Sequence, residues 1–134
     1  MIQRNEFDAT FEAIAEIMDF VEDMTKGLPE KAMYDLRLAS EEIVVNIVTY
    51  AYPAAGGPLA ITWDNDREKS TVTVEFEDSG IPFNPLEYPA PAVDVPLENR
   101  EIGGLGIMMV RKRMRDVRYR RAAGTNVLTV EYGI

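Results

Sequence analysis

The sequence predicts an α+β fold of about three helices and four strands. Apolar residues recur at helical spacing in two segments of the first half of the chain, and a third helix is expected after a glycine cluster. Apolar and polar residues alternate in the middle of the chain and near its end, which indicates strands. Its 134 residues, 46% of them hydrophobic, suffice for one core, so we expect a single domain over residues 1–134.

The first expected helix is amphipathic. Asp8 and Thr10 are alternative N-caps for it, and Gly27 follows its expected end. Its apolar residues at helical spacing are Phe11, Ile14, Ile17, Met18 and Val21. A second helix should begin near Pro29 and end before Pro53, because proline suits a first helical turn but interrupts a helix interior.

The interior of the second helix is rich in β-branched residues between positions 43 and 48, and this composition on its own favours a strand. Helical spacing over four turns instead indicates a helix that is buried nearly all round. The residues with this spacing are Leu36, Ser40, Ile43, Ile47 and Tyr50.

Two strands are expected over residues 59–63 and 71–77. The apolar residues of the second strand share one face, and the period of two places Asp78 on that same inward face. A buried carboxylate is costly without a partner. Asp78 is therefore either a capping or turn residue or a hydrogen-bond acceptor for a ligand.

The second half of the chain contains a long loop. Five of the eight prolines lie between residues 82 and 96, where no periodicity is visible, and we expect a lid or binding loop over residues 80–102. Beyond it, residues 103–106 should open the third helix, and strands are expected near 117–121 and 126–132.

Composition excludes several kinds of chemistry. The chain has no cysteine and no histidine, so proton transfer must fall to carboxylates or other groups. The net charge of −9 argues against binding to nucleic acid. The sequence has neither a long apolar run nor the charge order of a secretory signal at its start, so we expect a cytoplasmic protein that does not enter the membrane.

Basic residues are concentrated late in the chain. Seven of the 14 lie between residues 111 and 121, and residues 1–110 carry 7 basic and 21 acidic residues. This basic stretch is either a solvated face or a surface beside an anionic ligand or an acidic partner protein.

Two short patterns are candidates for a binding site. Glu42 and Asn46 are four residues apart, so both lie on one stripe of the second helix, which Glu41 does not share. They are suited to a hydrated Mg²⁺, although an Asn at this position can also bond to a neighbouring backbone group. The cluster at residues 103–106 offers backbone N–H groups at a helix start, which suits a phosphate, although helix capping explains such clusters about as often.

The order of these segments resembles the motifs of the GHKL ATPases, the superfamily that includes gyrase and the histidine kinases. Residues 41–52, EEIVVNIVTYAY, resemble the N box, and residues 78–83, DSGIPF, resemble the first glycine box. Residues 103–107, GGLGI, resemble the second glycine box, and residues 124–127, GTNV, are similar to the closing Gly-Thr element. The chain is most similar to the anti-sigma factor serine/threonine kinases. The resemblance implies a two-layer sandwich with a mixed, mostly antiparallel sheet that about three helices cover on one face.

The resemblance also implies roles for individual residues. Asn46 would coordinate Mg²⁺ at the phosphates, Asp78 would accept a hydrogen bond from the adenine amino group, and Glu42 would be the general base. The other residues implied in nucleotide binding are Gly80, Gly104, Leu105, Gly106, Arg100 and Thr125. Departures from the family pattern are Tyr50, where histidine is common, and a lid with Arg100 as its only basic residue.

The function expected from this resemblance is that of an ATP-dependent serine/threonine kinase. It would phosphorylate an antagonist-type partner protein and sequester an effector such as a sigma factor. The alternatives are a binding switch that responds to ATP without transferring phosphate, and an ATP hydrolase in which Glu42 activates water. A homodimer is a further expectation, from the resemblance and the mostly apolar first helix.

Overall fold

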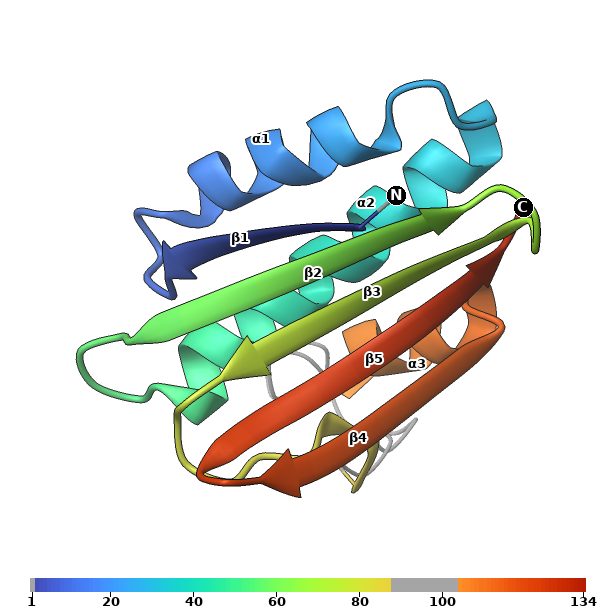
Figure 1. Ribbon diagram of the computed structural model, residues 1–134. Helices are drawn as coiled ribbons and strands as arrows, with labels where there is room; N and C mark the ends of the chain where they lie inside the picture. Colours follow the sequence, from blue (N-terminus) through green and yellow to red (C-terminus); the bar gives the residue numbers. More distant parts are fainter. Residues whose placement is uncertain (1, 88–103) are drawn as a thin grey trace.

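The computed structural model describes residues 2–87 and 104–134 (Figure 1). Its elements, in chain order, are β1 (Ile2–Asp8), α1 (Ile14–Thr25), α2 (Glu30–Asn46), a π-helical turn (Ile47–Ala51), β2 (Pro58–Asp66), β3 (Thr71–Asp78), a 3₁₀ turn (Pro85–Glu87), α3 (Gly104–Arg113), β4 (Asp116–Ala122) and β5 (Thr125–Gly133). Within the part of the chain that the structure describes, no helix has both the length and the apolar character needed to cross a membrane.

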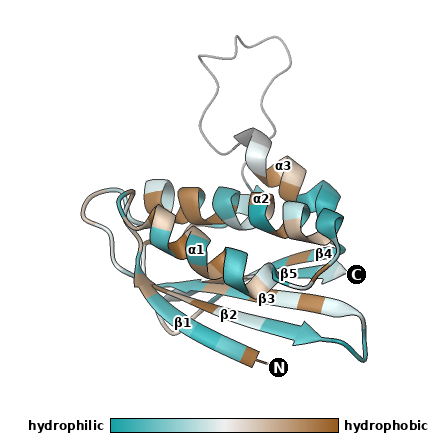
Figure 2. Cartoon of the chain, turned by 90° about the horizontal axis from the view of Figure 1, so that it is seen from above, coloured by the Kyte–Doolittle hydropathy of each residue, from teal (hydrophilic) through white to brown (hydrophobic). Residues whose placement is uncertain are grey.

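The strands form one sheet in the order β1-β2-β3-β5-β4, and each neighbouring pair is antiparallel. The three helices lie on the same side of this sheet (Figure 2). The predicted α+β fold, with helices on one face, is confirmed. The described sheet is antiparallel in all its pairs, and the expected sheet was mixed but mostly antiparallel.

Strand β1 was not predicted. It lies at an edge of the sheet and pairs along its whole length with β2, from Ile2 opposite Asp64 to Asp8 opposite Pro58. Most of its side chains are exposed, and its sequence, IQRNEFD, has no apolar alternation. Pairing with a neighbouring strand therefore decides the conformation of this segment, and local composition does not reveal it.

The first two helices occur where the spacing of apolar residues predicted them. α2 runs through the β-branched segment and continues into the π-helical turn, so its helical prediction is confirmed. α1 begins later than expected, because the hydroxyl of Thr10 accepts a hydrogen bond from Ala13 N at 3.2 Å in a turn before the helix. Phe11 consequently lies outside the helix and is 63% exposed.

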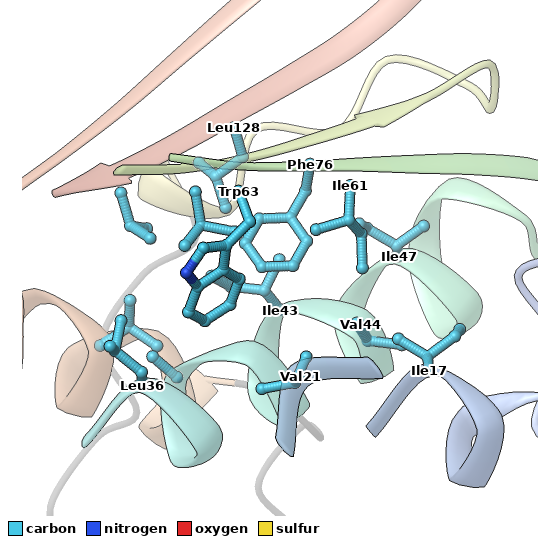
Figure 3. Close-up of a cluster of buried hydrophobic side chains, with 14 of the residues drawn as sticks. Ile17, Val21, Leu36, Ile43, Val44, Ile47, Ile61, Trp63, Phe76 and Leu128 are labelled. Atoms are coloured by element: carbon cyan, nitrogen blue, oxygen red, sulfur yellow. The ribbon is translucent and has the colours of Figure 1, made fainter. Parts of the chain in front are cut away.

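The hydrophobic core fills the space between the helices and one face of the sheet. Figure 3 shows Trp63 and Phe76 from the sheet directed toward Ile43 of α2. Removing a large apolar side chain of this kind from water contributes about 1.5–3 kcal/mol. The inward residues of β3 are Val72, Val74, Phe76 and Asp78. A carboxylate thus ends a strand face that is otherwise apolar, as predicted.

Candidate functional site

Asp78 lies at the end of β3 and is only 3% exposed. Its Oδ1 accepts hydrogen bonds from Gly80 N at 2.9 Å and from Asn126 Nδ2 at 2.9 Å. Burial raises the pKa of Asp78 above its ordinary value, although both hydrogen bonds and the charge of Arg121 act in the opposite direction. Both donors bind the same oxygen, so these contacts among the described residues leave Oδ2 as an acceptor for a ligand.

Asn126 on β5 is the hydrogen-bonding centre beside Asp78, which it faces in the strand register. Its Oδ1 accepts from Tyr119 Oη at 2.5 Å, Arg121 Nη1 at 3.1 Å and Phe83 N at 3.2 Å. Its Nδ2 donates to Asp78 and, at 2.8 Å, to the carbonyl of Ile81. Sequence reasoning missed this residue. The sequence pattern that could have identified it is the period of two along β5, which places Asn126 on the same inward face as Leu128 and Val130.

The first glycine loop packs against the end of the π-helical turn. A Cβ on Gly80 would lie 2.7 Å from the carbonyl carbon of Ala51, and Ile81 N donates to Ala51 O at 3.0 Å. The phenol of Tyr52 accepts from Ser79 N at 2.6 Å and donates to Pro58 O at 2.7 Å. Gly80 is therefore required for close packing of the backbone, whatever ligand the loop binds.

Asn46 is the last residue of α2 and is 3% exposed. Its Oδ1 has no hydrogen-bond partner among the residues that the structure describes. Buried side-chain oxygens are nearly always bonded, so an orphaned one needs an explanation. Asn46 also lines a small cavity together with Asp78 and Asn126. The structure therefore brings together two of the predicted site residues, one from the N box and one from the first glycine box.

This cavity has a volume of about 20 Å³, which is room for about one water molecule. Its other lining residues are Ile43, Ile47, Phe83, Pro85, Tyr119 and Leu128. A wider depression of about 840 Å³ lies at the opposite end of β2, around Trp63 and Asp66. None of the predicted site residues that the structure describes lines that depression, so we base the site on the hydrogen-bonding groups and not on the size of the hollow.

Glu42 is half-buried one turn before Asn46 on α2. Burial, and then the charge of Glu41, raises the pKa of Glu42 above its ordinary value. Its carboxylate lies against α3, since a Cβ on Gly106 would be 2.5 Å from Glu42 Cδ. Gly106 of the second glycine box is therefore in contact with Glu42 of the N box, which is the candidate general base.

The other end of α3 is fastened to α2 by Asp35, which is 1% exposed. Its carboxylate accepts hydrogen bonds from Lys31 Nζ at 2.7 Å, Arg113 Nη1 at 2.8 Å and Tyr132 Oη at 2.7 Å. Burial disfavours the charged carboxylate, but these three donors outweigh it and hold the pKa of Asp35 below its ordinary value. Asp35 and its three donors, which we call the Asp35 cluster, were not predicted.

The remaining predicted site residues are less well defined. The hydroxyl of Thr125 donates to Ala122 O at 2.8 Å, and it is Asn126 that contacts Asp78. Gly104 and Leu105 form the first residues of α3, and Arg100 lies outside the described residues. Only residues 80–87 of the predicted lid are described.

The basic stretch is largely neutralised within the molecule. Arg120 pairs with Glu75 at 3.8 Å, and Arg118 pairs with Glu131 at 3.2 Å on the sheet. Arg113 belongs to the Asp35 cluster, and Arg121 donates to Gly80 O at 2.9 Å. These contacts favour a structural role for most of the stretch, while Arg121 belongs to the site.

Comparison with known proteins identifies relatives over most of the chain. The profile of the family described as "Histidine kinase-like ATPase domain" matches residues 7–132. Serine/threonine-protein kinase BtrW of Bordetella bronchiseptica is 29% identical over 97 residues, which are 72% of this chain and 68% of that protein. Serine-protein kinase RsbW of Bacillus cereus is 27% identical over 100 residues, 73% of this chain and 62% of that protein. The chain thus spans less than two thirds of the Bacillus relative.

Solved structures share the fold. The crystal structure of the RsbU and RsbW domains of a Mycobacterium tuberculosis protein matches with a TM-score of 0.69 and 16% identity, covering 99% of this chain and 32% of that one. The histidine kinase domain of a blue-light activated histidine kinase from Erythrobacter litoralis matches with a TM-score of 0.56 and 12% identity, covering 90% of this chain and 59% of that one. At these identities the likeness concerns the fold alone.

Proposed function

The chain belongs to the histidine kinase-like ATPase domain family, and on this premise we propose that it binds Mg²⁺-ATP and phosphorylates a serine or threonine of a partner protein. The observation that carries the proposal is Asn46 Oδ1, which is buried without a partner among the described residues, in the same cavity as Asp78. An unsatisfied buried polar group costs about 1–3 kcal/mol, and a ligand that bonds it recovers this energy.

Asp78 would bind the base of the nucleotide. An ionised carboxylate only accepts hydrogen bonds, and the exocyclic amino group of adenine donates them. Because the cavity has room for about one water, binding of a purine requires the side chains that line it to move apart. Phe83 and Pro85 line the cavity from residues 80–87, the described part of the proposed lid over residues 80–102.

Asn46 would hold the metal ion. Mg²⁺ prefers hard oxygen ligands and keeps several positions for water and substrate phosphates. Across the described ranges, no group of three or more acidic side chains is placed to hold a metal on its own. A single amide oxygen therefore fits an ion that is held mainly by the phosphates and water. When bound, the ion would neutralise negative charge on the phosphates.

The first turn of α3 would bind the phosphates. Backbone N–H groups of Gly104, Leu105 and Gly106 are at the N-terminal end of the helix, where the helix dipole favours an anion. Glu42, which lies against Gly106, would take the proton of the attacking hydroxyl. The hydroxyl oxygen bonds to the γ-phosphorus while the bond to the bridging oxygen breaks and ADP leaves. Contacts of Arg100 and Thr125 with the nucleotide stay predictions.

The partners are proposed from the family resemblance, and the names of the relatives support its kinase activity. BtrW is named a serine/threonine-protein kinase and RsbW a serine-protein kinase. By analogy, the acceptor would be a cytoplasmic antagonist-type protein, and the chain would sequester an effector such as a sigma factor. We also propose a homodimer, in which the exposed Phe11 beside α1 could be covered. A monomeric mass by light scattering at high micromolar concentration would exclude the dimer.

Radiolabelled ATP tests the proposal. ATP labelled on the γ-phosphate is incubated with the protein, Mg²⁺ and a co-expressed antagonist-type protein. Label on the antagonist supports the kinase, and free labelled phosphate indicates a hydrolase. If the protein binds ATP but forms neither product, it is a binding switch. Binding is measured separately as a thermal shift, since ligand at about 100 times its dissociation constant adds about 2.7 kcal/mol to stability. A wild-type melting curve that millimolar Mg²⁺-ATP does not shift excludes the nucleotide site itself.

A further inference from the structure

We infer that Asn126, together with Gly80 N, sets the preference of the site between purines, by holding Asp78 so that Oδ1 is occupied and Oδ2 remains as the acceptor for the base. This inference rests on the proposed nucleotide site. It concerns a positioning residue, because Asn126 acts on the ligand through Asp78.

The orientation of the Asn126 amide follows from its neighbours. An amide presents either its oxygen or its NH₂ group to a partner, and the choice is read from the hydrogen-bonding network. The guanidinium of Arg121 and the backbone N–H of Phe83 can only donate, and both face Oδ1. A flipped amide would set NH₂ against these donors. Nδ2 must therefore face Asp78 and the carbonyl of Ile81.

This orientation does not depend on the segment that has to move when a purine enters. Phe83 belongs to that segment, but Arg121 lies on β4 and Asn126 lies on β5, which are paired directly opposite each other. The contact between Arg121 and Asn126, at 3.1 Å, is sufficient to keep the amide oxygen turned away from Asp78. The pairing of β4 with β5 thus fixes the orientation of Nδ2 of Asn126, the group that donates to Asp78.

The consequence is a preference between purines that differ at one position. A 6-amino group, as in adenine, donates a hydrogen bond to Oδ2 of Asp78. A 6-oxo group, as in hypoxanthine, presents an acceptor to an acceptor, and two buried groups are left unpaired. Such a mismatch reduces affinity by roughly 10- to 100-fold. We expect wild-type protein to bind ATP more tightly than inosine triphosphate by this factor.

Asp78→Asn separates the role of Asn126 from simple packing. Gly80 N and Asn126 Nδ2 both donate to the oxygen at the Oδ1 position, so the new amide must place its NH₂ group at the Oδ2 position. That position then donates, and it matches a 6-oxo group. We expect Asp78→Asn to bind inosine triphosphate more tightly than ATP, which reverses the wild-type preference.

The experiment measures the dissociation constants of both Mg²⁺-nucleotides by calorimetry for wild type, Asp78→Asn, Asn126→Ala and the double variant. We expect Asn126→Ala to reduce the preference for ATP, because Gly80 N alone then holds Oδ1, and the double variant to show a weaker reversal than Asp78→Asn. Thr129→Ala, also on β5 but out of step with the inward residues, is the control and should keep the wild-type ratio. If Asn126→Ala does not fold, the inference is tested by Asp78→Asn alone. It is overturned if Asp78→Asn still binds ATP more tightly than inosine triphosphate.

The outcomes separate the two proposals. Wild-type protein that binds neither nucleotide contradicts the proposed function and, with it, this inference. The other case is that wild-type protein prefers ATP but Asn126→Ala keeps the wild-type affinity ratio, or the double variant keeps the full reversal. Either result overturns the role of Asn126 and leaves the nucleotide site intact.

Discussion

The carboxylate of Glu42 on α2 occupies the place where a side chain on Gly106 of α3 would lie. A Cβ built on Gly106 would overlap Glu42 Oε2 and would lie 2.5 Å from Glu42 Cδ. The glycine therefore has a steric role here as well as offering a backbone N–H group. The general-base candidate and the second glycine box share one contact, so a change in either residue affects the other.

Gly106→Ala is expected to displace the Glu42 carboxylate without unfolding the protein. The overlapped atoms are the end of a flexible side chain, which can rotate away, and alanine suits a helix better than glycine does. A catalytic group that is misplaced by about 1 Å can cost roughly 100-fold in rate. Initial rates of phosphotransfer and melting temperatures check this prediction.

Gly133→Ala is the matched control for this substitution. Its Cβ would meet Arg115 no closer than 3.4 Å, an ordinary contact, so we expect wild-type phosphotransfer. If Gly106→Ala also transfers phosphate at the wild-type rate, the contact with Glu42 does not position a catalytic group.

Asp78→Asn is expected to stabilise the protein without ligand while abolishing its thermal shift with ATP. Burial raises the pKa of Asp78, so keeping its carboxylate ionised costs stability above that raised pKa. The amide keeps both hydrogen bonds to its oxygen and removes the buried charge, which should add about 1 kcal/mol, or roughly 2–6 °C, at neutral pH. The gain should vanish in acid, where wild-type Asp78 is itself protonated. A variant that melts below wild type at neutral pH contradicts this account.

Local patterns predicted most of the fold. Helical spacing correctly predicted a helix through the β-branched part of α2, and the period of two placed Asp78 on the core face of β3. Both patterns lie within one element, where periodicity alone shows which side chains are buried.

Contacts between distant segments were not predictable in this way. β1 depends on pairing with β2, and Asn126 meets Asp78 across 48 residues of sequence through the register of β3 and β5. Asp35 meets Arg113 across 78 residues. A single sequence does not specify such registers, so the groups that orient the predicted residues were found only in the structure.

Phosphotransfer should require ionised Glu42 and should fall as the pH drops through its raised pKa. Burial is the larger cause of the rise, and Glu41 is the second. Glu41→Gln removes the neighbouring charge, so the acid limb of the pH–rate profile should move to lower pH. Glu30→Gln, in the first turn of the same helix, is the control. Profiles of the rate constant at saturating ATP check the shift, and an acid limb that stays in place or moves upward contradicts it.

The Asp35 cluster should stabilise the protein near neutral pH and lose this effect in acid. Because the pKa of Asp35 is lowered in the folded state, its stabilisation is present above the ordinary carboxyl pKa and is lost as the pH falls through the lowered value. Asp35→Asn should therefore cost about 1.5–3 kcal/mol at pH 7, the range for hydrogen bonds to charged groups. The deficit relative to wild type should shrink toward pH 3.

Urea unfolding at the two pH values measures this difference, with Glu22→Gln as the matched control. Glu22 pairs with Arg37 at 3.4 Å on the surface, where losing an ion pair costs about 1 kcal/mol or less. Phosphotransfer by Asp35→Asn should fall as well, since Arg113 no longer fastens the end of α3 that sets the position of Gly106 against Glu42. Equal deficits at both pH values would show that Asp35 contributes through packing and not through its charge.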